Sequence, residues 1–218
     1  MLGETRLPHR LQHKGSNVGG LSGMDYDPAS STYYLLSNDG GSFSPPRFYT
    51  ARIALKVDKL SEIELTGVTF LQGLSAPDPE AIRWHAPSQS LLWTSEGNAV
   101  RFFIAPALYQ TRMDGALLRT YPLPAMFDFG ALTGSRINKT LDALAIAPNG
   151  QTARGRWKQR CGKTEKSQGL AATAGRVALH KLISPVAKPC GKSPTCQTLC
   201  PARPRRPVPM PTTRWSRF

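Results

Sequence analysis

Short stretches of alternating apolar and polar residues recur along the first two-thirds of the chain. Three of them align with one another, 20–40 (GLSGMDYDPASSTYYLLSNDG), 78–98 (DPEAIRWHAPSQSLLWTSEGN) and 140–152 (TLDALAIAPNGQT). Each opens on a polar, a small and an aliphatic residue, continues as a short strand and reaches a proline-containing turn, and in the first two a second apolar strand follows. Strands and turns repeated about every 60 residues predict a repeated antiparallel sheet unit, as in a propeller blade.

Further strands are expected between these repeats, over 47–55, 63–72 and 100–110. Residues 112–124 predict a hairpin around Asp114-Gly115, because an Asp-Gly pair suits a type I′ turn. No stretch of ten or more residues has convincing amphipathic helical spacing. The pattern therefore predicts an all-β body.

Charge divides the chain near the point where this pattern stops. Residues 1–150 contain 13 Lys and Arg against 13 Asp and Glu, whereas residues 151–218 contain 15 against a single acid, Glu165. The whole net charge of +14 and all four cysteines therefore lie in the last part, in which Pro and Arg are crowded together. Low aliphatic content with high net charge predicts a disordered or weakly structured basic tail over 153–218.

The tail also indicates an error of reading frame. When the third base of each codon is read with the first two bases of the next, segments 154–165, 182–192 and 211–218 permit acids and strand-like alternation. In the first of these segments the codons of Trp157 and Lys158 require a Glu, within a possible Trp-Ala-Met-Glu. We therefore expect residues from about 153 to be out of frame and the chain to be a truncated product.

The body resembles the family named for the esterase-like activity of phytase, also called phytase-like domain proteins. The resemblance extends in order over about residues 5–152. It is found in LPHRLQHKGSNVGGLSGMDYDP, YYLLSNDGG, PPRFYTARIAL, DPEAIRWHAPSQSLLWTSEGN, DGALLRTYPLP and GSRINKTLDALAIAPNGQT. It implies an incomplete β-propeller over 1–152, an exported or periplasmic location and a phosphoric-ester or carboxylic-ester hydrolase.

The same resemblance implies a set of site residues. The acidic motifs of the family fall on Asp78 and Glu80 of DPEAI, Glu96 of SEGN and Asp39 of SNDG. Its later motif has a Glu before Gly, where this chain has Asp142-Ala143, and the polar pair before that motif matches Arg136 and Asn138. We expect Asp39, Asp78, Glu80, Glu96, Asn138 and Asp142 to be metal ligands and Arg136 to bind substrate.

Several acids at the inner ends of propeller strands suit a hard cation such as Ca²⁺, which takes six to eight oxygen ligands. The alternative is that an Asp or Glu beside Gly or Pro shapes a turn. The function expected is therefore metal-dependent ester hydrolysis of a small molecule, impaired or absent in the chain as translated, and the alternative is a non-catalytic binding module. Catalytic residues stay unassigned, because Ser22 in GGLSGM lacks the last Gly of a nucleophile elbow.

Other partners are constrained by composition. No apolar run approaches the length of a membrane span, and the start MLGETRLPHRLQHKG lacks the basic-then-apolar pattern of a signal peptide. The basic tail predicts non-specific, salt-dependent attachment to nucleic acid, and it lacks the interleaved aromatic residues of a stacking platform. No specific nucleic-acid partner is expected.

Overall fold

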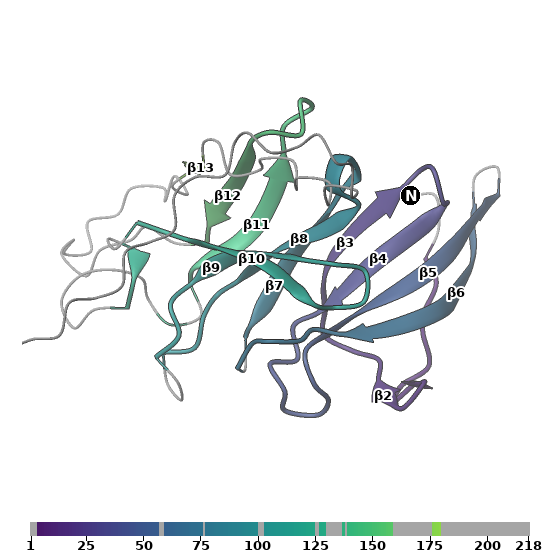
Figure 1. Cartoon of the computed structure of the whole chain (residues 1–218). Coiled ribbons are helices and arrows are strands. Elements are labelled where there is room, and N and C mark those ends of the chain that lie inside the picture. The colour runs from purple at the N-terminus through teal and green to yellow at the C-terminus, as the bar shows by residue number, and fades with distance from the viewer. Residues whose placement is uncertain are drawn as a thin grey trace, which may run out of the picture. The chain divides into compact units, whose positions relative to one another are not determined.

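The computed structural model describes residues 4–56, 59–75, 77–99, 103–124, 127–129, 137, 139–158 and 176–179. Strands make up nearly all of the regular secondary structure of these ranges, with a short 3₁₀ helix, η1 (Ala86–Ser88), between two of them. The all-β fold class is therefore confirmed (Figure 1). Within the same ranges no helix has the length and apolar character needed to cross a membrane.

The first large sheet is an antiparallel meander of four strands, each paired with the next along the chain. It consists of β3 (Leu21–Asp27), β4 (Thr32–Ser37), β5 (Arg47–Lys56) and β6 (Lys59–Phe70). The strand expected over 47–55 matches β5, and β6 begins four residues before the expected 63. A small hairpin of β1 (Gln12–His13) and β2 (Ser16–Asn17) precedes this sheet.

The second sheet repeats the same four-stranded meander. Its strands are β7 (Pro79–His85), β8 (Ser90–Ser95), β9 (Ala107–Thr111) and β10 (Leu117–Pro122). Every residue of β8 is buried, including Ser90 and Ser95, because both faces of this strand are covered by neighbouring sheets. Such burial on both faces is typical of a propeller blade between two others.

The hairpin between β9 and β10 forms as expected, but its turn is not of type I′. That type needs a positive φ at both central residues, and here Gly115 has a φ of 86° whereas Asp114 is not among the residues with positive φ. The Asp114 carboxylate accepts the backbone N–H of Ala116 at 3.0 Å and pairs with Arg112 at 2.5 Å. These side-chain contacts stabilise a longer turn, closed by the bond from Arg112 N to Ala116 O at 2.9 Å.

The third sheet contains β11 (Leu141–Ile146), β12 (Ala153–Trp157) and β13 (Arg176–Leu179) in antiparallel order. The strand β12 lies beyond the boundary expected at residue 152. Its side chains alternate between buried and exposed, and Trp157 is 2% exposed beside Phe127. Sheet pairing therefore continues the folded body at least to Trp157.

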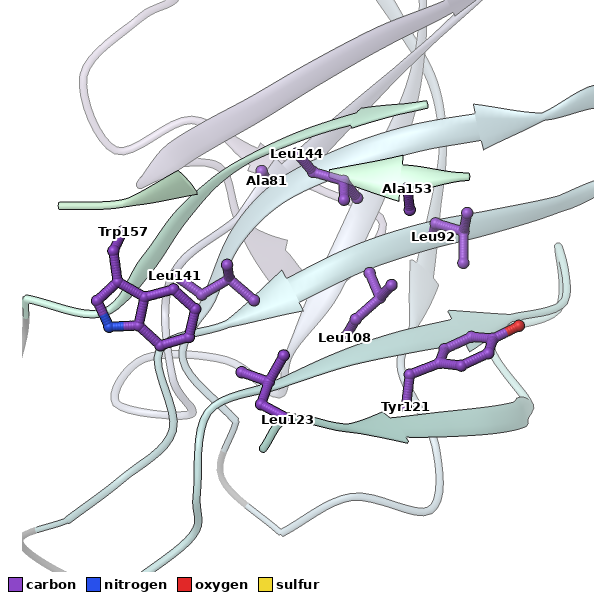
Figure 2. Packing of buried hydrophobic residues seen from close by; sticks show 9 residues of the cluster. All are labelled: Ala81, Leu92, Leu108, Tyr121, Leu123, Leu141, Leu144, Ala153 and Trp157. Carbon is purple, nitrogen blue, oxygen red and sulfur yellow. The ribbon is translucent and has the colours of Figure 1, made fainter. Parts of the chain in front are cut away.

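Blades of a β-propeller account for this arrangement, with the first strand of each sheet innermost. The inner strand β7 contacts β3 on one side and β11 on the other. Apolar side chains fill the space between successive sheets, and one such cluster joins the second sheet to the third (Figure 2). Its buried members are Ala81, Leu92, Leu108, Tyr121, Leu123, Leu141, Leu144, Ala153 and Trp157.

The first two inner strands approach so closely that only a glycine fits at one position. A Cβ on Gly23 of β3 would lie 2.9 Å from the backbone N of Ile82 and 3.0 Å from the Cα of Ala81. Both atoms belong to the backbone of β7, so no side-chain rotation can relieve the contact. This contact sets how closely the first two blades pack at the inner face.

Replacing Gly23 by Ala is expected to destabilise the chain by about 1–3 kcal/mol, because the added methyl must separate two packed backbones. Gly19→Ala is the matched control, since a Cβ there would have no atom within 4 Å. Urea denaturation followed by tryptophan fluorescence measures both variants. Equal midpoints for the two variants would contradict the proposed role of Gly23.

Candidate metal centre

The same backbone geometry recurs at the inner end of all three sheets. In each, the residue after the second strand donates its N–H to the carbonyl just before the first strand. The three bonds run from Asn38 to Gly20 at 2.7 Å, from Glu96 to Asp78 at 2.9 Å and from Lys158 to Thr140 at 2.8 Å. The three sheets can therefore be compared residue by residue at this end.

A β-bulge lies beside each of these bonds, and it places a polar residue at the inner end of each inner strand. The register shifts occur between Leu21 and Gly23, between Pro79 and Ile82, and between Leu141 and Ala143. The second residue of the inner strand is then Ser22, Glu80 or Asp142, as the aligned repeats predict. Bulges commonly redirect a side chain toward a functional site.

Three acidic side chains from the second sheet converge at this end. Asp78, Glu80 and Glu96 each offer a carboxylate oxygen, and these oxygens lie within 4.8 Å of one another. Glu80 is 9% exposed and Glu96 is 1% exposed. Three carboxylates at this spacing repel one another when charged, so the group favours a bound cation or bound protons.

Glu96 is positioned by the third sheet. Its Oε1 accepts the backbone N–H of Thr140 at 3.2 Å, and its own carbonyl accepts the Thr140 hydroxyl at 2.9 Å. Its Oε2 is buried and has no hydrogen-bond partner among the described residues. A buried carboxylate oxygen without a donor is costly, and this oxygen belongs to the acidic group, where a cation would satisfy it.

Burial and mutual repulsion raise the affinity of this group for protons. Burial raises the pKa of Glu80 to about 7, and the charges of Glu96 and Asp78 add to the effect. Burial also raises the pKa of Asp78 and of Glu96, with the Lys158 ammonium opposing it in both cases. Without a cation, ionisation of each of the three carboxyl groups is therefore less favourable than it is in water.

Asp142 lies at the edge of this group and is paired with a basic residue. Lys158 Nζ donates to Asp142 Oδ1 at 3.1 Å, and each side chain is about two-fifths exposed. The charge of Asp142 contributes to raising the pKa of Glu80 and of Glu96. The third sheet thus adds one acid and one base to the site.

Asp39 lies one residue past the position that corresponds to Glu96, which Asn38 occupies. Its carboxylate accepts the backbone N–H groups of Ser42 at 2.8 Å and of Ser44 at 2.9 Å, and it pairs with Arg47 Nη1 at 3.1 Å. Burial opposes ionisation, but these donors keep the pKa of Asp39 below its usual value. The structure therefore places this carboxylate in a loop-closing network and not with the three converging acids.

Two of the expected site residues, Arg136 and Asn138, lie outside the described residues. Ser22 occupies the bulge position of the first sheet, where its hydroxyl donates to the Pro79 carbonyl at 3.1 Å. This bond joins the first two inner strands. It gives Ser22 a structural use at the position where the other sheets have acids.

Neither the aligned repeats nor the family resemblance indicated Lys158, Thr140 and Asn38 as neighbours or counterparts of the acidic group. A signal was present, because Asn38, Glu96 and Lys158 each follow the bulge residue of their sheet by 16 positions. The acid-glycine pair in SNDG and SEGN obscured this spacing in the first repeat. In the third repeat, the basic composition after residue 152 obscured it.

A pocket of about 900 Å³ lies at the corresponding end of the first sheet. Gly20 and Asn38, the counterparts of Asp78 and Glu96, belong to its lining. His9 and Arg10 line it as well, and Phe43 contributes an apolar side chain that is 81% exposed. A Cβ on Gly40, another lining residue, would lie 3.2 Å from the carbonyl of Pro77, just before the acidic group.

Comparison with known proteins gives one family and a weak structural likeness. The family called Phytase-like, described as esterase-like activity of phytase, matches residues 16–168. No curated protein gave a match. Among solved structures, the periplasmic gluconolactonase of Pseudomonas aeruginosa is similar with 12% sequence identity and a TM-score of 0.42. That match covers 66% of this chain and 38% of the gluconolactonase.

The raised pKa of Glu80 predicts how stability depends on pH when cations are removed by a chelator. The carboxyl binds its proton more tightly in the folded state than in the unfolded state. Its contribution to the free energy of unfolding is therefore fully present below about pH 4.5 and is lost as the pH rises through about 7. Above pH 7, Glu80→Gln should therefore be more stable than the unchanged chain by roughly 1–3 kcal/mol.

Thermal unfolding in chelator at several pH values between 4 and 8 measures this difference. Glu64→Gln is the control, because Glu64 is exposed on β6. We expect the stability of Glu80→Gln to fall less with pH than that of the control. Parallel curves for the two variants would contradict the assignment of a buried, repelled carboxyl to Glu80.

Proposed function

The chain belongs to the Phytase-like family, and we propose that its acidic group holds a divalent cation for the hydrolysis of phosphoric or carboxylic esters. The group provides carboxylate oxygens, which are the preferred ligands of Ca²⁺. Asp78, Glu80 and Glu96 would hold the cation. The match to the gluconolactonase covers 38% of that protein, and it is a likeness of fold that carries no substrate to this chain.

The observation that supports the proposal most strongly is the unpaired oxygen of Glu96. Oε1 of this side chain is fixed by Thr140, which leaves the buried Oε2 free of protein donors among the described residues. A turn-shaping role, the alternative considered for these acids, would use the oxygens on nearby backbone N–H groups, as Asp39 does with Ser42 and Ser44. Glu96 instead has an oxygen available for a ligand.

The other residues expected at the site, Asp142, Asn138, Arg136 and Asp39, have different roles in this proposal. Asp142 lies close enough to influence Glu80 and Glu96, and it would extend the ligand set if its contact with Lys158 opened. Asn138 as a further ligand and Arg136 as a substrate-binding residue stay predictions from the family resemblance. Asp39 also stays a prediction, and binding there would require its bonds to Arg47 and the loop to break.

Ester hydrolysis adds water across one bond. The water oxygen bonds to phosphorus or to the acyl carbon, the bond to the alcohol oxygen breaks, and the alcohol leaves with a proton. A bound divalent cation would polarise the phosphoryl or acyl oxygen and stabilise the negative charge that develops on it. Asp78, Glu80 and Glu96 would fix its position, and the burial of Glu80 and Glu96 would limit competing water.

The pocket beside Asn38 is the proposed place for the rest of the substrate. Arg10 and His9 offer donors there to an anionic or polar group, and Phe43 offers an apolar surface. The pocket lies at the end of the first sheet that corresponds to the acidic end of the second. We propose a small-molecule ester as substrate and, from the family resemblance, an exported location.

The test of the proposed function combines cation binding with turnover. Calorimetric titration of the chelator-treated chain with CaCl₂ should show one site, and Glu96→Gln should weaken it at least tenfold. Hydrolysis of p-nitrophenyl phosphate or p-nitrophenyl acetate should be slow, since the chain is expected to be impaired. It should require calcium and fall at least tenfold in Glu96→Gln.

Glu64→Gln serves as the control on the exposed face of β6, with binding and turnover unchanged. Calcium binding with neither ester hydrolysed, both by this chain and by a version whose reading frame is corrected after residue 152, would refute the hydrolase and support the non-catalytic binding module. Failure of the chain to bind any of Ca²⁺, Mg²⁺ or Mn²⁺ would refute the metal centre itself.

A further inference from the structure

Lys158 occupies a position at which the other two sheets present oxygen-bearing side chains. Its backbone N–H donates to Thr140 O at 2.8 Å, as Asn38 donates to Gly20 and Glu96 to Asp78. The counterparts of the lysine are therefore an amide and a carboxylate. A cation replaces a ligand oxygen at the inner end of the third sheet.

The contacts of Lys158 direct its charge toward the acidic group. Its Nζ lies 3.1 Å from Asp142 Oδ1, and the ammonium lowers the pKa of Asp78 and Glu80 against the effect of their burial. The peptide of Thr140 connects the two sheets, since its N–H donates to Glu96 Oε1 and its carbonyl accepts from Lys158 N. Glu96 Oε1 and the backbone N–H of Lys158 thus bind to the N–H and the carbonyl of the same residue, Thr140.

We infer that Lys158 is a tethered counter-ion that competes with a divalent cation for the centre formed by Asp78, Glu80 and Glu96. The inference rests on the proposed function. A positive charge beside the site repels an incoming dication, and the pairing of Nζ with Asp142 withholds a fourth carboxylate from it. Neutralising Lys158 removes both effects.

The genetic code allows a comparison of position 158 with the second sheet, because any codons for residues 154–158 can be read in another frame. Read in the other frame, they permit Trp-Ala-Met-Glu, in which the Glu is required by the codons of Trp157 and Lys158. This string parallels Trp93-Thr94-Ser95-Glu96 of the second sheet. A Glu in place of Lys158 would give the third sheet the same carboxylate that the second sheet has.

Calcium affinity of the full 218-residue chain tests the inference by calorimetric titration after chelator treatment. Lys158→Met should bind Ca²⁺ about tenfold more tightly than the unchanged chain, and Lys158→Glu more tightly still. Lys158→Arg, which keeps the charge, should bind as the unchanged chain does. Arg156→Met is the matched control, because it removes one exposed positive charge from the same strand.

The outcomes separate this inference from the proposed function. If the unchanged chain and Lys158→Met bind calcium equally, the counter-ion role is refuted while the metal centre stands. An equal gain in Arg156→Met would also refute it, because the effect would then follow net charge. If neither the unchanged chain nor Lys158→Met or Lys158→Glu binds calcium, although their unfolding temperatures show folded protein, both proposals fail.

Discussion

The convergence of three carboxylates, two of them buried, at the inner end of one sheet is the constraint on which this site depends. Burial and mutual repulsion both oppose ionisation there, and Glu96 keeps a buried oxygen without a donor among the described residues. A protein that is stable near neutral pH must balance these charges with protons, with its own cation or with a bound one. The proposals for calcium and for Lys158 describe two of these solutions competing at the same place.

Repetition of the sheet unit explains how the carboxylates come together. Each of the three sheets has a bulge in its inner strand and a backbone hydrogen bond between the ends of its first two strands. The residue types at these repeated positions therefore decide which side chains lie at the inner end of each sheet. The first sheet has Ser22 and Asn38 there and adjoins a pocket, whereas the second has Glu80 and Glu96. One scaffold thereby provides a pocket at the inner end of the first sheet and an acidic group at the inner end of the second.

Much of the fold, and part of the candidate site, was predictable from short-range patterns in the sequence. The alternation of strands and turns predicted the all-β fold, and the aligned repeats predicted matching places for Ser22, Glu80 and Asp142. The repeats align Asp39 with Glu96 because each precedes a glycine. Strand register instead aligns Asn38 with Glu96, and Asp39 forms an ion pair with Arg47. Lys158 was missed because charge composition assigned it to the tail, while its place follows from pairing between β11 and β12. Composition averages over residues, whereas register depends on the hydrogen bonds between paired strands.

The central claim is that these carboxylates share one cation, and anomalous diffraction from crystals soaked in a terbium salt, a calcium substitute, tests it most directly. The account predicts a peak within about 2.3–2.6 Å of carboxylate oxygens from Asp78, Glu80 and Glu96, with Glu96 Oε2 among its ligands. A map without a peak there at saturating terbium, with the three carboxyl groups hydrogen-bonded to one another or to Lys158, would contradict it.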